Sequence, residues 1–150
     1  MEVRGHQITA DADLAGADLT DADLRTVDLT GAWLGGAVLS GSDLSDARLI
    51  GADLRHAICR GTVFADADLH HANLWSADLR DARMGGAILG RAWLGNARLA
   101  GTDLRSADMR GASFIAADLP RSLLGPSTPP GAPLTPTLLA SCVPPGGARG

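Results

Sequence analysis

Residues 12–51 read ADLAG ADLTD ADLRT VDLTG AWLGG AVLSG SDLSD ARLIG, which is eight consecutive units of five residues. The same register continues without an insertion or deletion through residue 126, so the chain holds 23 such units. We call the third residue of each unit its centre. Eighteen centres are Leu, and the residue two positions before the centre is Ala in 18 units. An internal repeat of this regularity decides the fold before any single motif is considered.

The departures from the repeat keep its chemistry. The centres that are not Leu are Cys59, Phe64, Met84, Met109 and Phe114. The units without Ala begin with Val27, Ser42, Thr62, Thr102 and Ser122. The residue just before the centre is Asp in 11 units and Asn in one, at Asn73.

The spacing of the apolar residues fits neither a helix nor a continuous strand. Apolar positions fall at i and i+2 and are followed by a gap of three, whereas a helix needs i, i+3, i+4 and a strand needs strict alternation. A chain that alternates briefly and then turns a corner every five residues must coil. Each unit buries only one Leu and one Ala, so neighbouring coils have to stack to form a core.

The A-[D/N]-L-x-x pattern of residues 12–126 resembles that of the pentapeptide-repeat family. The resemblance implies an all-β fold, a right-handed quadrilateral β-helix in which four units form one coil. Residues 20 apart would then stack on one face, and 23 units would make about six coils. It also implies that the centre and the residue two before it point inward, while the other three positions point outward.

Two segments flank the predicted β-helix. Residues 1–11 form an N-terminal lead-in that could cap the first coil, since the ends of such a rod expose strand edges. Residues 127–150 are rich in Pro and Gly and are predicted to be a flexible tail, whose apolar stretch 134–143 could fold back over the last coil. The resemblance implies that those family members which dimerise do so through a C-terminal helix and apolar surface. This tail does not resemble such a helix, so a homodimer is possible but gains no support from the tail.

The recurring polar residues predict structure rather than chemistry. An Asp before the centre can accept backbone N–H groups at the corners, and Arg48, Arg83 and Arg98 each stack one coil away from an Asp. Cys59 is a centre and should face the core, so it is not a candidate nucleophile. With His56, it gives too few convergent ligands for zinc. We therefore expect no catalytic residue, no cofactor, no metal and no enzymatic activity.

The first ten residues lack the basic and apolar regions of a signal peptide, and no apolar run approaches the length of a membrane span. The expected location is the cytoplasm.

Large apolar residues at outward positions carry the first functional hypothesis. Trp33 and Trp93 precede their centres, while Trp75 and Ile115 follow theirs, and with four units per coil all four share one face. Exposed aromatic clusters often mark interaction sites. The sequence thus favours a non-catalytic protein-interaction module or scaffold, whose partner is another protein that binds this face.

Acidic residues near the N-terminus carry an alternative hypothesis. Residues 1–50 hold nine acids against three Arg, and the candidate patch comprises Asp13, Asp18, Asp21, Asp23 and Asp28. The resemblance implies that such a protein could mimic DNA, bind DNA gyrase and give quinolone-like resistance or self-protection. Against this stands the net charge of −4, because duplex DNA as long as the rod, roughly 27 Å, would carry roughly 16 charges. Direct binding to nucleic acid is not expected from an acidic chain.

Overall fold

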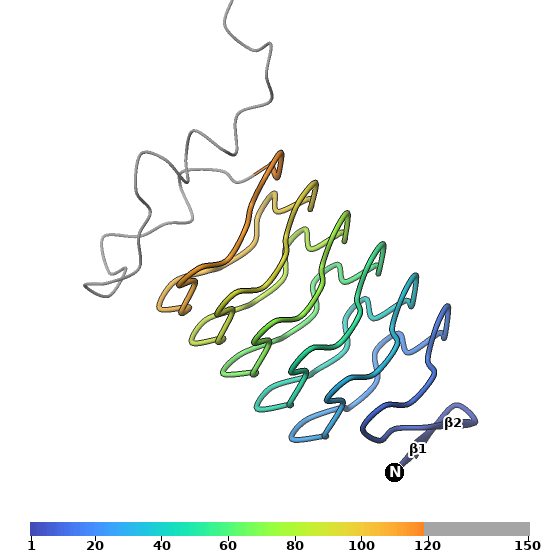
Figure 1. Ribbon diagram of the computed structural model, residues 1–150. Helices are drawn as coiled ribbons and strands as arrows, with labels where there is room; N and C mark the ends of the chain where they lie inside the picture. The colour runs from blue at the N-terminus through green and yellow to red at the C-terminus, as the bar shows by residue number, and fades with distance from the viewer. Residues whose placement is uncertain (119–150) are drawn as a thin grey trace, which may run out of the picture.

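A computed structural model describes residues 1–118, and Figure 1 shows them as a stack of coils that forms a rod. The N-terminus lies at one end of the rod. The last predicted units, residues 119–126, and the predicted flexible tail, residues 127–150, lie outside the described residues.

Parallel bridges between residues 20 apart define the coil. They run without a break from Asp13 with Trp33 to Trp93 with Ser113, so every coil takes four five-residue units. The Leu14 N–H donates to the Trp33 carbonyl at 2.8 Å, and the Trp33 N–H donates to the Ala12 carbonyl at 2.9 Å. The backbone hydrogen bonds therefore run between coils, and the predicted β-helical solenoid is confirmed.

The chain begins with a short antiparallel hairpin. Strand β1, Glu2–Val3, pairs with strand β2, His6–Gln7, and the turn between them uses positive φ angles of 48° at Arg4 and 82° at Gly5. Ile8 follows and is buried, with its N–H bonded to the Met1 carbonyl at 2.7 Å. Arg4 holds the hairpin against the first coil through Asp18, at 3.1 Å, and through the Thr20 carbonyl, at 2.9 Å.

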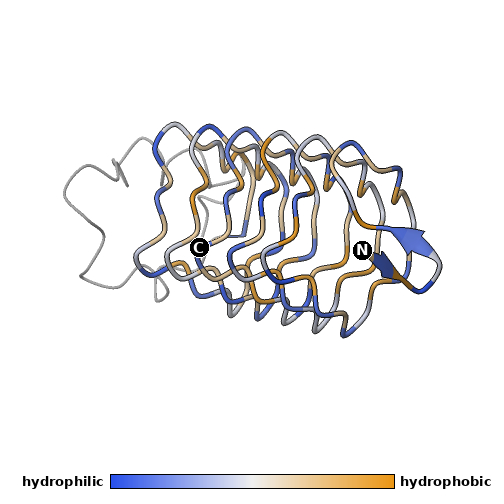
Figure 2. Ribbon diagram, turned by 90° about the horizontal axis from the view of Figure 1, so that it is seen from below, coloured by the Kyte–Doolittle hydropathy of each residue, from blue (hydrophilic) through white to orange (hydrophobic). Residues whose placement is uncertain are grey.

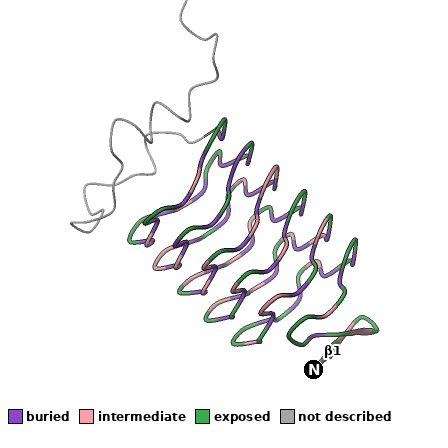
Figure 3. Cartoon of the chain, viewed as in Figure 1, coloured by how far each residue is buried: buried purple, intermediate pink, exposed green. Residues whose placement is uncertain are grey.

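The core is a column of centres beside a column of small residues. Every centre from Leu14 to Phe114 is at most 2% exposed, as the purple positions in Figure 3 illustrate. Hydrophobic and hydrophilic positions alternate along the coils in Figure 2. The hydroxyls of Ser42 and Thr62 donate to the Leu39 carbonyl at 2.6 and 2.7 Å, so these buried polar groups are satisfied. The predicted inward positions are buried in the described residues, except that Ala12 and Val27 are partly exposed. Most predicted outward positions are at least partly exposed, and the exceptions are Asp78, Gly90 and Gly95, which are buried.

The corners depend on a left-handed backbone. Every fifth residue from Asp11 to Ala116 has a φ between 54° and 77°. Glycine adopts this conformation freely, whereas other residues pay a steric cost. The corner residues from Asp11 to Asn96 donate their N–H groups to the next coil, as the Gly36 N–H does to the Arg55 carbonyl at 2.8 Å. Stacking of the coils thus holds the corners in place.

Candidate interaction face

The Asp residues of the repeat build the corners. For each repeat Asp from Asp13 to Asp108, a side-chain oxygen accepts the N–H of the residue two positions later, as Asp13 does from Ala15 at 3.2 Å. Asn73 does the same for Trp75 at 3.1 Å, which shows that the amide can replace the carboxylate. The predicted structural role of these side chains is confirmed, and their recurrence follows from the backbone they support.

Arg residues two positions after an Asp form ion pairs that the sequence analysis missed. The pairs are Asp23–Arg25, Asp53–Arg55, Asp78–Arg80, Asp103–Arg105 and Asp108–Arg110. The hydrogen bond from Arg55 holds the pKa of Asp53 below its usual value. The sequence pattern D-x-R predicts such an ion pair, because both residues point outward on the same side of a coil.

Asp78 forms ion pairs with three Arg residues, more than any other Asp of residues 1–118. Its carboxylate is bound by Arg80 at 2.7 Å, by Arg60 at 2.8 Å and by Arg98 at 3.6 Å. Its side chain is only 12% exposed. Hydrogen bonds from Arg80 first, and then from Arg60, hold the pKa of this carboxyl far below its usual value.

The Arg residues that replace Asp behave largely as expected. Arg48 pairs with Asp28 at 3.5 Å, and Arg98 pairs with Asp78. The charge of Arg83 contributes to lowering the pKa of Asp103, although the hydrogen bond from Arg105 is the main cause. Asp68, which lies one coil beyond Arg48, is bonded to His70, at 3.1 Å.

Trp33, Trp93 and Ile115 are the most exposed large apolar residues of the repeats, at 64%, 58% and 55%. Successive bridges link Trp33 to Asp53, Asp53 to Asn73 and Asn73 to Trp93, so the two Trp lie in one column three coils apart. The side chains stand on strands whose backbone is already hydrogen-bonded. The face therefore presents its aromatic groups from a rigid surface.

Trp75 is less available than predicted. Its indole lies over Gly95 of the following coil, where a Cβ would overlap the ring, and it leaves Gly95 buried. Trp75 itself is only partly exposed. The sequence signal was a glycine 20 positions after a tryptophan, which leaves room for the ring.

The acidic residues of the alternative hypothesis do not form one patch. Asp13, Asp18, Asp23 and Asp28 come from successive units, so they lie on the four different faces around the first coil. All are exposed, as is Asp21 at a corner. Asp18, Asp23 and Asp28 pair with Arg4, Arg25 and Arg48, which leaves Asp13 and Asp21 outside the ion pairs of residues 1–118.

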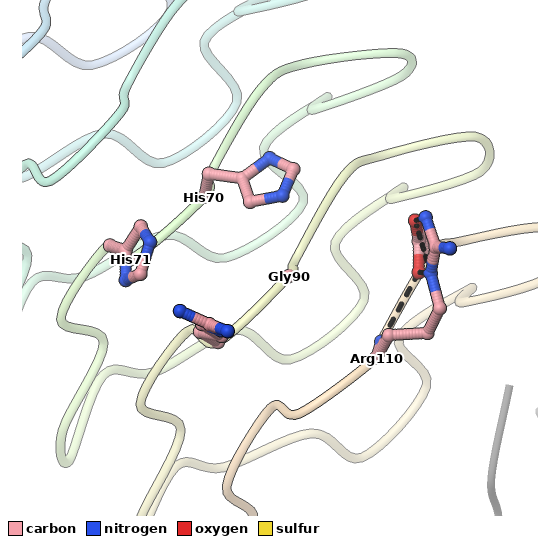
Figure 4. A pocket seen from close by; sticks show the side chains of 6 residues that line it. His70, His71, Gly90 and Arg110 are labelled. Atoms are coloured by element: carbon pink, nitrogen blue, oxygen red, sulfur yellow. Dashed lines mark hydrogen bonds and ion pairs between the residues drawn. The ribbon is translucent and has the colours of Figure 1, made fainter.

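A shallow pocket of about 430 Å³ lies at one corner of the rod, lined by His70, His71, Gly90, Arg91, Asp108 and Arg110 (Figure 4). The two His rings lie 6.2 Å apart, and Arg110 is held by Asp108. Within residues 1–118 no group of His, Cys, Asp and Glu could hold a metal ion.

Cys59 is fully buried, and burial raises the pKa of its thiol to about 12. A thiol of this kind stays protonated at neutral pH and cannot be reached by a substrate. Among the described residues no helix is long and apolar enough to cross a membrane.

Comparison with known proteins agrees with this architecture. Residues 10–124 match the family described as pentapeptide repeats, in eight copies, and the chain belongs to that family. A pentapeptide-repeat protein of the Arabidopsis thaliana thylakoid lumen is 30% identical with a TM-score of 0.65, covering 67% of this chain and 70% of that one. No protein of curated function matches the sequence.

Two cyanobacterial structures are also similar. HetL of Nostoc, involved in regulating heterocyst differentiation, is 28% identical with a TM-score of 0.57 over 75% of this chain. Rfr23 of Cyanothece is 31% identical with a TM-score of 0.52 over 69% of this chain. This chain spans 63% of the first and 64% of the second.

Proposed function

We propose that this chain is a non-catalytic interaction module, a right-handed quadrilateral β-helix that binds another protein through the Trp face. We define the Trp face as the side of the rod that carries Trp33, Trp75, Trp93 and Ile115. The observation that carries the proposal is the pair of indoles in one column, each more than half exposed. Large aromatic side chains at the centre of a contact supply much of the binding energy in protein interfaces.

The rigidity of the scaffold supports the same role. A surface that is already ordered loses little conformational entropy when it binds. The Trp face also avoids dense charge, because its Asp53 is neutralised by Arg55 at 2.6 Å and Asn73 replaces an Asp. A partner with an apolar, aromatic or weakly polar surface suits these groups.

The gyrase-binding DNA mimic remains the second candidate, favoured by the exposure of Asp13 and Asp21. Its support is smaller, because three of the five proposed carboxylates are paired with Arg. A mimic needs unbalanced charge that follows the DNA backbone, and its binding would weaken steeply with salt.

A comparative pull-down tests the proposal. Trp33→Ala combined with Trp93→Ala should abolish capture of the partner and leave the melting temperature nearly unchanged, because both side chains are exposed. Ile58→Ala, which removes a 39% exposed side chain from another face, is the matched control. Undiminished capture by the double variant would refute the Trp face. Inhibition of gyrase supercoiling that is lost when Asp13, Asp18, Asp23 and Asp28 become Asn would establish the second candidate instead.

A further inference from the structure

The two exposed indoles of the Trp face are placed symmetrically along the rod. We infer that the Trp face binds a second copy of this chain, face to face with the rods antiparallel, and this inference rests on the proposed function. The two-fold axis would lie in the plane of the contact, midway between Asp53 and Asn73. Such an interface is isologous, so the pattern along the face has to complement its own reversal.

On the Trp face, the residues that directly precede the centres form a column along the rod, and this column meets that condition. In order along the rod it reads Asp13, Trp33, Asp53, Asn73, Trp93 and Ser113. Reversal about its midpoint places Trp33 opposite Trp93 of the second copy. Asp53 then faces Asn73, and Asp13 faces Ser113. Every carboxylate of this column thus meets a hydrogen-bond donor, and each indole meets an indole.

The residues that directly follow the centres on the Trp face form a second column, and its two ends also complement each other when the column is reversed. It reads Ala15, Gly35, Arg55, Trp75, Gly95 and Ile115. Reversal places Arg55 opposite Trp75 of the second copy, and Ile115 opposite Ala15. The Arg55 guanidinium is already fixed by Asp53 at 2.6 Å, so it can stack on the indole without being ordered anew. At Gly35 a Cβ would meet only the Arg55 carbonyl, at 3.8 Å, which leaves open surface beside Trp33.

The other three faces fail the same condition. On the next face, reversal of the column from Asp18 to Asp118 pairs these two carboxylates with each other. The third face would pair Asp23 with Asp103. The fourth would pair Asp28 with Asp108 and Asp68 with itself. Like charges that face each other oppose association, although the ion pairs of Asp23, Asp28, Asp103 and Asp108 with Arg residues of their own chain reduce this effect. Among the four faces of residues 13–118, only the Trp face places no carboxylate opposite another carboxylate.

The size of the face predicts a weak dimer. The columns extend over roughly 25 Å at about 4.8 Å per coil, and one side of a coil is about 10 Å wide. The contact is therefore well below the roughly 800 Å² per partner of a standard interface. The four exposed indoles of Trp33 and Trp93, two from each copy, favour association, but a dissociation constant in the micromolar range or above is expected.

Sedimentation velocity of the full chain over a wide concentration range tests the dimer. A reversible monomer–dimer equilibrium is expected, and Asn73→Asp should weaken it about tenfold or more, because in each of the two symmetric contacts it places a carboxylate opposite Asp53 of the other copy. Added salt should restore part of the loss. The fold should tolerate this change, since Asp is the usual residue of the position and Asp23 already stacks on Asp43. Ser106→Asp adds the same charge at an exposed corner and should have no effect.

Cross-linking tests the orientation. In a Cys142→Ser background, Asp13→Cys and Ser113→Cys copies should be joined by a short bis-maleimide only when they are mixed. Cys59 is buried and should not react. Efficient linkage of Asp13→Cys copies to each other would overturn the antiparallel arrangement.

The inference and the proposed function fail differently. A chain that stays monomeric at all concentrations, or a dimer insensitive to Trp33→Ala and to Asn73→Asp, would overturn the inference. If a monomeric chain still captured another protein through its Trp residues, the proposed function would stand without the dimer.

Discussion

The indole of Trp75 lies across Gly95 of the following coil and occupies the space that any larger residue would need for its Cβ. The glycine and the tryptophan are 20 residues apart, which is one coil, so they stack directly. The contact buries part of a large apolar side chain on the outside of the rod. The Trp face therefore has one indole that packs against the rod, that of Trp75, and two that are mostly exposed, those of Trp33 and Trp93.

Gly95→Ala should displace the Trp75 ring from its position over residue 95, because the added Cβ would overlap the ring. The φ of Gly95 is not left-handed, so the expected loss of about 1 to 2 kcal/mol comes from displaced apolar contact and not from backbone strain. Thermal melting measures the loss, and iodide quenching of Trp75 fluorescence in a Trp33→Phe, Trp93→Phe background measures the exposure. Gly35→Ala is the control and should change neither, since a Cβ there has room. Equal effects of the two substitutions would contradict the packing of Trp75 on Gly95.

Acid should remove the stabilising effect of the Asp78 cluster. The pKa of Asp78 is lowered in the folded chain, so the unfolded chain binds the proton more readily. The stabilisation is present above the unfolded value of about 4 and is lost as the pH falls below it. At neutral pH, Asp78→Asn should cost about 1 to 3 kcal/mol, because it leaves three Arg without their carboxylate.

The pH dependence of melting separates this effect from a general one. Asp78→Asn should flatten the stability curve between about pH 4 and pH 2. Asp13→Asn is the control for the loss of one negative charge, because Asp13 makes its corner hydrogen bond but no ion pair within residues 1–118. A curve for Asp78→Asn that parallels the wild type would show that the cluster does not stabilise the fold.

Core and surface substitutions should differ sharply. Leu54→Asp or Leu74→Asp places an unpaired carboxylate among residues that are 0% exposed, and should cost more than about 4 kcal/mol, enough to unfold the rod. Asp68→Ala removes the acceptor for the His70 N–H and should cost about 1 kcal/mol. Circular dichroism melts compare them, and similar losses would contradict the inward and outward assignment.

The corner positions should accept residues that tolerate a left-handed backbone and be destabilised by residues that do not. Gly36 has a φ of 67° and open space around its Cβ position, so only the backbone opposes a substitution. Gly36→Val should cost about 2 kcal/mol or more, whereas Gly36→Asn should cost about 1 kcal/mol or less. Asn96 already occupies such a corner at 55°. Chemical denaturation measures both, and the reverse order would refute the steric account.

The periodicity was sufficient to predict the architecture and the direction of nearly every side chain. This worked because each coil interacts mainly with its neighbours, so local sequence and global fold carry the same information. The prediction placed Leu54 and Cys59 inside and Trp33 and Trp93 outside, as the structure does.

Side-chain contacts between coils were harder to predict. The position of Trp75 depends on a glycine one coil away. Asp68 is bonded to His70, two residues along its own coil, whereas Arg48 pairs with Asp28. The acidic residues Asp13, Asp18, Asp23 and Asp28 looked like one patch along the sequence, yet the corners spread them around the rod. The composition of a segment gives its charge, but the turn of the coil decides where that charge points.

The unbroken register of 20 residues per coil gives this chain an unusual response to changes in its length. Loss of one five-residue unit between Trp33 and Trp93 would leave every side chain inside or outside as before. It would also rotate all later residues by one face, so the two indoles would part without any loss of core. Loss of 20 residues would shorten the rod and keep them aligned. Duplication and deletion of units can therefore create or erase a binding surface while the fold persists.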